Sequence, residues 1–324
     1  MKRREFLKAG LITALGLIPN KASGLEVIAN GKIIDTLSET PVENARLKFY
    51  SYPGNGLLKE CATNSSGEYS TVPVGIGYDK WMDIKKLYND DNEFDKLRKN
   101  TINKKVAKRA DNNWAKVLIN HDNYFDAGRY VDLSKNEFNT DIIPKTFDME
   151  LFDMWCRDPA LGGCTQRWEE QPKWYIDTSP AYGSDKEVTQ DKIDLVKEII
   201  NNDLVQFSNE FINAPYIEGG REPPTFGTNG LVLISWDDTG GPGVHAEWLD
   251  KNKIYAGAIL FNTTGPDRLV YLEELTQVLG PRTGSETRNF WDENGRYLPV
   301  AYDIGKVLYS RPIGSRSPDI DPEP

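Results

Sequence analysis

The amino-acid sequence predicts an α+β protein in which an N-terminal β-sandwich is followed by an α/β domain. Its 324 residues favour two domains over one. Across residues 25–145, apolar and polar residues alternate as they do in strands. Across residues 146–312, strand-like runs and helical patterns follow one another, which is typical of a layered α/β domain. A hydrophobic content of 39% suffices for a core in each domain and excludes a disordered chain.

Residues 1–24 have the pattern of an export signal. A basic start that includes Arg3-Arg4 precedes an apolar run from Ala9 to Pro19. The paired arginines and the following Phe6-Leu7-Lys8 resemble the twin-arginine type, which implies a bacterial protein that is exported to the periplasm or secreted. The alternative is an ordinary secretory signal or an uncleaved anchor. An uncleaved signal is the only membrane attachment we expect, because no internal run reaches the roughly 20 apolar residues of a spanning helix.

The net charge and the cysteines limit the partners, disulfide bonds and metal sites that this chain could have. The formal charge of −10 argues against a nucleic-acid partner, since such proteins neutralise phosphates. In an exported protein Cys156 and Cys164 are near enough in sequence to pair, which would leave Cys61 as a small buried apolar residue. The chain has no Cys-x-x-Cys pair, which argues against a sulfur-ligated zinc site.

The first domain is predicted from strand pairs around turn-forming segments. "GKIIDTLSETPVENARLKFYSY" alternates on both sides of Ser38-Glu39-Thr40-Pro41, and "ECATNSSGEYSTVPVG" does so around Asn64-Ser65-Ser66-Gly67. The arrangement resembles the carboxypeptidase regulatory-like (transthyretin-like) β-sandwich. The resemblance implies a module that braces or presents a neighbouring domain and carries no chemistry of its own. The residues that carry it are Gly31, Asp35, Pro41, Ala45, Thr63, Gly67 and Tyr69.

A basic insertion at residues 80–113 interrupts this domain. Its stretch "KLRKNTINKKVAKR" has seven basic residues and no acid. Such a run suits an anionic surface partner, for example a cell-surface polymer or lipid headgroups. The alternative is that this basic stretch is a solvated helix or loop. We favour this interpretation because runs of charged residues are usually exposed to solvent without binding a partner.

The second domain has a predictable order of elements. "RWEEQPKWYIDT" contains a strand, and Asp185 to Phe211 has the pattern of one long helix with Ser184 as its N-cap. "GLVLISWDD" is a buried strand, and "GVHAEWLDKNKIYAGAILFN" gives two strands joined at Asp250-Lys251-Asn252. A helix in "RLVYLEELTQVLGPRTG" and a last helix in "VAYDIGKVLYS" follow. We expect the Pro-rich, acidic tail of residues 313–324 to be disordered.

The helix that starts near Arg268 carries the candidate site. Leucines at helical spacing give it one core face, and Gly280 followed by Pro281 marks its end. Glu273 and Gln277 are four residues apart, so their side chains lie on the same face.

The order of elements across residues 144–312 resembles the metzincin-like branch of zinc metallopeptidases, which implies a mixed sheet with two long helices. The features that match are Arg167-Trp168, Tyr175-Ile176-Asp177, the strand pair around Gly243 and Ile259, Gly280, and Asp303 with Leu308-Tyr309. The zinc motif HExxHxxGxxH of the family falls on EExxQxxGxxT in this chain. The general-base position is Glu274, and the three zinc-ligand positions are Glu273, Gln277 and Thr283.

The departure from that motif decides the expected function. Catalytic zinc needs about three strong donors, whereas glutamine and threonine offer only neutral oxygens. Without a metal ion, water keeps a pKa of about 15.7 and Glu274 would be a vestigial base. We therefore predict no metal and no cofactor. The predicted function is a pseudo-peptidase that binds a peptide or protein in a cleft formed by Glu273, Gln277, Thr283 and His245.

Two other functions fit the sequence. The first is a hydrolase that uses a non-zinc metal or the carboxylate pair Glu273 and Glu274, assisted by Asp237, Asp238 or Asp177. The second is an envelope structural or adhesion protein, with the sandwich and residues 80–113 as its working surface.

Overall fold

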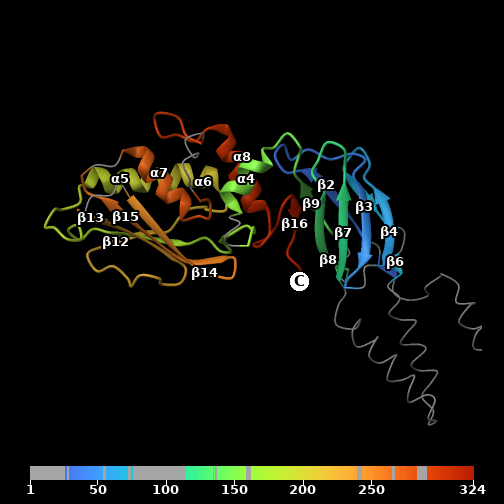
Figure 1. Ribbon diagram of the computed structural model, residues 1–324, viewed down its shortest axis with the longest axis horizontal. Coiled ribbons are helices and arrows are strands. Elements are labelled where there is room, and N and C mark those ends of the chain that lie inside the picture. The colour runs from blue at the N-terminus through green and yellow to red at the C-terminus, as the bar shows by residue number, and fades with distance from the viewer. Residues whose placement is uncertain are drawn as a thin grey trace, which may run out of the picture. The chain divides into compact units, whose positions relative to one another are not determined.

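The structure is a computed structural model with helices and several sheets, arranged in two compact units (Figure 1). The first unit holds residues up to Ile34, Thr40–His121 and Gly128–Asp141, and the second holds Asp35–Glu39, Asp122–Ala127 and Ile142–Pro324. The predicted export signal and the basic insertion at 80–113 lie outside the described residues. The residues that the structure describes are 26–27, 29–53, 56–71, 74–75, 114–133, 135, 137–157, 162–238, 243–264, 267–282 and 290–324.

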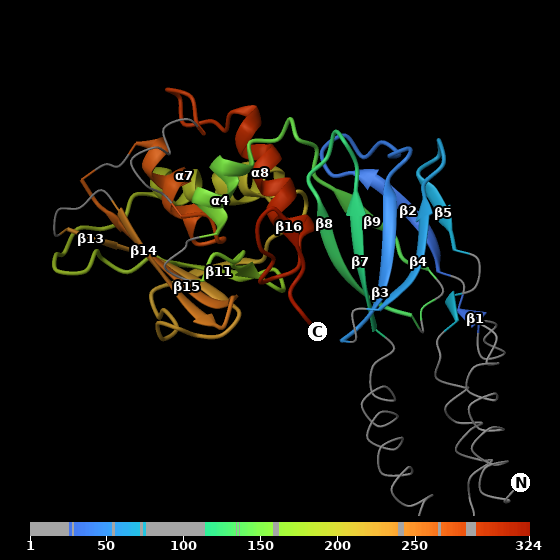
Figure 2. The same cartoon turned by 45° about the vertical axis from the view of Figure 1, so that its right-hand side comes forward.

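The first unit consists of strands, as the alternation predicts (Figure 2). Strands β8, β7, β3 and β4 lie in this order in one sheet, β5, β2 and β9 form a second, and β1 pairs with β6. Every second residue of β3 and β7 points into the core, for example Leu47, Phe49 and Val117, which are all fully buried. The bounds are β1 Glu26–Val27, β2 Asn30–Asp35, β3 Arg46–Ser51, β4 Leu57–Ala62, β5 Glu68–Ser70, β6 Val74–Gly75, β7 Trp114–Asn120, β8 Ala127–Asp132 and β9 Thr140–Ile142.

The turn predicted between β4 and β5 is present. The Asn64 side chain accepts hydrogen bonds from the backbone N–H groups of Ser66 and Glu68, both at 2.9 Å. Gly67 has a φ of +72°, and a Cβ atom there would lie 2.5 Å from the carbonyl oxygen of Ile33. Glycine is therefore required at this position by both conformation and space.

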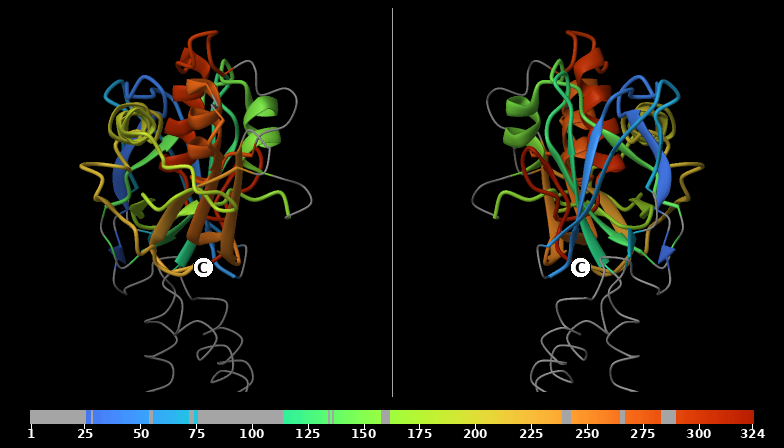
Figure 3. Two further views of the ribbon diagram at one scale, coloured as in Figure 1. Left: turned by 90° about the vertical axis from the view of Figure 1, so that its left-hand side faces the viewer. Right: turned by 90° about the vertical axis from the view of Figure 1, so that its right-hand side faces the viewer.

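The second unit is a mixed sheet with its helices on one face (Figure 1, Figure 3). The strand order is β10-β15-β13-β11-β12, all parallel, and β14 pairs antiparallel with β15. Among the described residues β14 pairs with no other strand, so its edge away from β15, here called the outer edge, is unpaired. The strand bounds are β10 Arg167–Trp168, β11 Lys173–Asp177, β12 Ile217–Gly220, β13 Leu231–Asp237, β14 Gly243–Asp250 and β15 Lys253–Asn262. The short strand β16, Asp319–Ile320, is not part of this sheet.

The core of this unit lies between the helices and the sheet. Its fully buried side chains include Trp155, Trp174, Phe261 and Leu272. The helices are α4 Met149–Cys156, α5 Gln190–Glu198, the π-helical turn η2 Ile199–Asp203, α6 Leu204–Phe207, α7 Arg268–Gln277 and α8 Pro299–Ser310. Within the described part of the chain, no helix is long and apolar enough to cross a membrane.

The long helix predicted from Asp185 starts later than expected. It begins at Gln190 with Thr189 at the N-cap position, so Ser184 is not its cap. The Ser184 hydroxyl instead accepts a hydrogen bond from the backbone N–H of Lys186 at 3.1 Å, within a turn. The short strand β12 was not predicted, because its sequence Ile-Glu-Gly-Gly has no alternating pattern.

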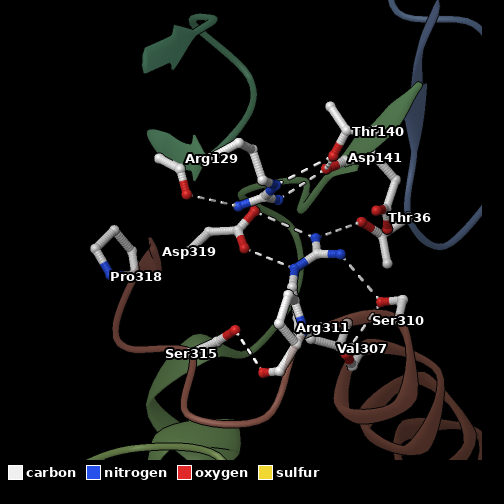
Figure 4. A network of polar contacts seen from close by, with 12 residues as sticks. Thr36, Arg129, Thr140, Asp141, Val307, Ser310, Arg311, Ser315, Pro318 and Asp319 are labelled. Carbon is white, nitrogen blue, oxygen red and sulfur yellow. Dashed lines mark hydrogen bonds and ion pairs between the residues drawn. The ribbon is translucent and has the colours of Figure 1, made fainter. Parts of the chain in front are cut away.

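The prediction that residues 313–324 are disordered is wrong. The Arg311 guanidinium is 1% exposed and Asp319 is fully buried, and the two form an ion pair with a nitrogen–oxygen distance of 2.6 Å (Figure 4). Arg311 also donates hydrogen bonds to the hydroxyl groups of Thr36 and Ser310, at 2.9 and 3.1 Å. Composition indicated disorder, but a buried guanidinium requires a counter-ion, and the tail supplies it.

The three cysteines are free thiols, so the pairing considered for Cys156 and Cys164 is not formed. Cys156 and Cys164 are both buried, and Cys164 accepts a hydrogen bond from the Arg316 guanidinium at 3.4 Å. Cys61 is partly exposed and not buried as expected, and desolvation raises the pKa of its thiol to about 11. Burial raises the pKa of the Cys156 thiol as well, so Cys61 and Cys156 are protonated at neutral pH.

Candidate functional site

Helix α7 is fixed at both ends by contacts that its sequence supplies. Asp267 is the N-cap and accepts a hydrogen bond from the backbone N–H of Val270 at 3.1 Å. Arg268, the first helical residue, donates to Asp203 at 2.7 Å and to Glu198 at 3.1 Å. The predicted core face is confirmed, because Leu272 and Leu275 are fully buried.

Gly280 ends the α7 region, as predicted. It has a φ of +127°, and a Cβ atom there would lie 2.2 Å from the carbonyl oxygen of Gln166. The chain next to β10 therefore passes directly against the end of α7, and no residue with a side chain fits between them.

Strand β14 brings a second set of polar residues to α7. His245 pairs with Ile259 of β15 and Glu247 pairs with Gly257. Residues two apart on a strand share a face, so His245 and Glu247 point the same way. That face is the one covered by α7, because a Cβ atom on Gly257 would lie 2.5 Å from the side chain of Val278.

The closest polar contact between the two elements joins His245 and Glu274. Nδ1 of His245 lies 2.8 Å from Oε2 of Glu274, and the two side chains are 24% and 13% exposed. An ionised carboxylate can only accept a hydrogen bond, so the Nδ1–H of the imidazole is the donor. The glutamate at the predicted general-base position is therefore held by an imidazole from the edge strand.

Glu247 lies near this contact and is strongly perturbed. Its Oε1 is completely enclosed and has no hydrogen-bond partner among the described residues. Desolvation raises the pKa of Glu247 to about 7, and electrostatic interactions with His245 and Arg282 oppose that rise only in part. The Arg282 guanidinium donates a hydrogen bond to the side-chain oxygen of Gln166 at 3.1 Å.

The predicted site residues are only partly brought together. Glu274 and His245 are in contact. Glu273 is partly exposed on the neighbouring face of α7, whereas Gln277 is 5% exposed and belongs to the packed side of the helix. Thr283 lies outside the described residues.

The acids proposed to assist Glu273 and Glu274 have partners elsewhere. Asp177, at the end of β11, accepts hydrogen bonds from the backbone N–H of Ser179 and from the Ser235 hydroxyl. Asp238, just after β13, binds Lys186 at 2.7 Å and Thr263 at 2.8 Å. Asp177 and Asp238 therefore complete local turns and strand ends.

Glu247 was not among the site residues predicted from the sequence, although its position on the predicted strand indicated it. It follows His245 by two residues in a predicted strand, which places both on one face. Because this face borders the candidate helix, Glu247 could have been assigned to the candidate site together with His245. Its enclosure could not be foreseen, because burial depends on tertiary packing and the strand pattern shows only which residues share a face.

The described side chains around α7 do not form a donor set that fits a catalytic zinc ion. The side chain at the second ligand position, Gln277, offers a neutral amide oxygen and is buried. His245 is the single histidine of this unit, since the other, His121, belongs to the first unit. In the described ranges, no group of three or more His, Cys, Asp or Glu side chains is placed to hold a metal ion.

Fold and site together define a two-unit protein with an α/β domain whose edge strand and buried helix share a histidine–glutamate contact. A comparison with known protein families finds no family that matches the chain. No curated protein matches it either.

Proposed function

We propose that the second unit is a metallopeptidase-like domain that binds an extended peptide segment along the outer edge of β14 and does not hydrolyse it through zinc. The order of elements supports the metzincin-like assignment. Strand β11 precedes the helical segment α5 to α6, three of the following strands join it in the sheet as predicted, and α7 and α8 come after them. The whole chain would act as an exported bacterial protein, on the strength of residues 1–24.

The hydrogen bond between His245 and Glu274 is the observation that carries this proposal. In the proposed alignment Glu274 takes the position of the general base, and its carboxylate is already engaged by an imidazole at 2.8 Å. The ligand positions hold Glu273 and the buried amide of Gln277. This arrangement suits a stable structural contact better than the activation of a metal-bound water.

Edge strands offer a general means of peptide binding. An unpaired strand edge presents backbone N–H and C=O groups, and an extended peptide can add to it as a further strand. β14 is the antiparallel edge strand of its sheet, and α7 covers the face next to it. A peptide on the outer edge would therefore place alternate side chains next to His245 and Glu247.

The first test of this function uses an N-methyl scan. Terminally blocked peptides that bind the purified protein would be selected from a random hexapeptide library, and each backbone N–H would be methylated in turn. Strand addition predicts that methylation weakens binding at every second position and has little effect between them, because only alternate amides face the edge. A uniform effect, or no bound peptide, would contradict strand addition.

The second test addresses the metal. Protein purified without chelators should contain no stoichiometric zinc and should show no chelator-sensitive peptide hydrolysis. Stoichiometric zinc together with proteolysis that a chelator abolishes would overturn the pseudo-peptidase proposal.

A second candidate function is metal-independent acid–base hydrolysis, and one observation favours it. A carboxyl group with a pKa of about 7, Glu247, lies near an imidazole that is held by another carboxylate. A pKa near the working pH suits a general acid or base. This candidate predicts a hydrolysis that chelators do not affect and that Glu247→Gln and Glu274→Gln each abolish, whereas the binding proposal predicts no hydrolysis in any variant.

A further inference from the structure

Glu247 has an unsatisfied acceptor and belongs to β14, the strand whose outer edge the proposed function assigns to a ligand. A fully enclosed carboxyl oxygen without a hydrogen-bond donor is destabilising by roughly 1–3 kcal/mol, and native proteins rarely leave one unpaired. The enclosed atom here is Oε1 of Glu247. We infer that the peptide bound along β14 carries a lysine or arginine side chain opposite Glu247, and that Glu247 is its counter-ion; this inference rests on the proposed function.

Within the sheet, no donor reaches Glu247 from β15. The residue directly opposite is Gly257, which has no side chain. The space above Gly257 is filled by apolar atoms of Val278, Val232 and Trp168, at 2.5 to 3.5 Å from a Cβ atom built there. A donor for Glu247 must therefore come from another direction, and the outer edge of β14 is the side on which a ligand strand would lie.

Two polar groups near Glu247 have hydrogen bonds to other residues. Nδ1 of His245 is bonded to Glu274, and the Arg282 guanidinium donates to Gln166. Two carboxyl groups, Glu247 and Glu274, thus share the surroundings of one guanidinium and one imidazole. The chain as a whole carries a formal charge of −10, which adds a long-range attraction for a cationic ligand.

Strand addition sets the distance between the partners. Side chains directly opposite on neighbouring strands have Cβ atoms about 4.5–5.5 Å apart, and opposite charges at such positions attract. Because Glu247 as a residue is partly exposed, we expect a change of rotamer to bring its carboxyl group to the outer edge. A cation favours that carboxyl group over a neutral donor, since charge-assisted hydrogen bonds are about twice as strong as neutral ones.

The experiment uses the full chain and a positional-scanning library of terminally blocked hexapeptides. At each position lysine, arginine, norleucine and citrulline are compared, because norleucine and citrulline keep the length of the side chain and remove its charge. Binding is measured by fluorescence anisotropy on the wild type and on Glu247→Gln. The matched control is Glu218→Gln, which removes an exposed glutamate from β12, the strand at the other edge of the sheet.

The expected result is a preference for lysine and arginine over their uncharged counterparts at one position, by roughly tenfold or more for a charge-assisted hydrogen bond. Glu247→Gln should remove the preference, Glu218→Gln should keep it, and Glu247→Asp should retain it in weaker form. Binding without any charge preference, or a preference that survives in Glu247→Gln, would overturn this inference and leave the proposed function standing. If no library member binds, the proposed function fails and the inference falls with it.

Discussion

At the scale of single residues, Glu274 and Glu247 differ in their surroundings. Glu274 is partly exposed and accepts a hydrogen bond from His245 at 2.8 Å. Glu247 has an enclosed carboxyl oxygen and a pKa raised by desolvation to about 7. The difference is set by neighbours and not by sequence position, and it leads to two separate predictions.

The first prediction concerns the dependence of stability on pH. Glu247 has a pKa of about 7 in the folded state and of about 4.5 in the unfolded chain. Below about pH 4.5 both states are protonated, and as the pH rises to 7 the unfolded state loses its proton first, so stability is lost. The loss amounts to about 3 kcal/mol above pH 7.

We therefore expect Glu247→Gln to be more stable than the wild type at pH 7.5 and close to it at pH 4.5. Denaturant unfolding at both pH values measures this difference, with Glu218→Gln as the control for the loss of one exposed charge. A Glu247→Gln variant with the wild-type pH dependence would show that the carboxyl group ionises freely in the fold.

The second prediction concerns the contact between His245 and Glu274. Hydrogen bonds to charged groups contribute about 1.5–3 kcal/mol when buried, and the partial exposure of both side chains lowers this to about 1 kcal/mol. A double-mutant cycle with His245→Ala and Glu274→Ala, measured by denaturant unfolding, gives the coupling energy. A coupling within the experimental error would mean that the two groups are neighbours without a stabilising interaction.

At the scale of elements, the order and type of most strands and helices could be predicted, and their limits less well. The alternation in β3 and β7 marks the residues that are buried, such as Leu47 and Val117, because one face of each strand packs on the core. The start of α5 was misplaced, since Ser184 suits a turn as well as a helix cap and only its surroundings decide between them. The candidate helix was located correctly, while the enclosure of the Glu247 carboxyl oxygen depends on tertiary packing, which the pattern of a single strand does not show.

The third prediction belongs to the junction between α7 and β10. Replacing Gly280 by alanine combines a φ of +127° with a contact of 2.2 Å to the carbonyl oxygen of Gln166. Backbone strain of this kind costs about 1–3 kcal/mol, and the displacement of a packed backbone adds to it. We expect a loss of at least about 3 kcal/mol in the free energy of unfolding.

Gly230 provides the matched control for this substitution. It also has a positive φ, +74°, but a Cβ atom there would meet no atom within 4 Å. Gly230→Ala should therefore show the conformational cost alone, about 1 kcal/mol. Equal losses for Gly230→Ala and Gly280→Ala, measured by thermal and denaturant unfolding, would contradict the close approach of Gln166 to the end of α7.

At the scale of the whole molecule, the C-terminal tail is part of the second unit and not an appendage. Arg311 ends α8 and lies at 1% exposure, and its counter-ion Asp319 comes from the tail (Figure 4). Removing one partner of a buried ion pair leaves an uncompensated charge, which costs about 3–5 kcal/mol. The tail should therefore contribute to the stability of the domain that carries α7 and β14, although its composition resembles that of a disordered segment.

The last prediction tests this dependence with two truncations. A chain that ends after Ile320 keeps Asp319 and should retain nearly the full stability of the second unit, since the four residues it lacks are largely exposed. A chain that ends after Pro312 leaves Arg311 without its carboxylate, and its free energy of unfolding should fall by about 3–5 kcal/mol. Asp319→Asn distinguishes the charge from the packing, because it keeps the shape of the side chain and should reproduce most of the loss. If both truncated chains and Asp319→Asn unfold at the wild-type denaturant concentration, the Arg311–Asp319 pair is not formed in solution. The tail would then be disordered, as its composition predicts.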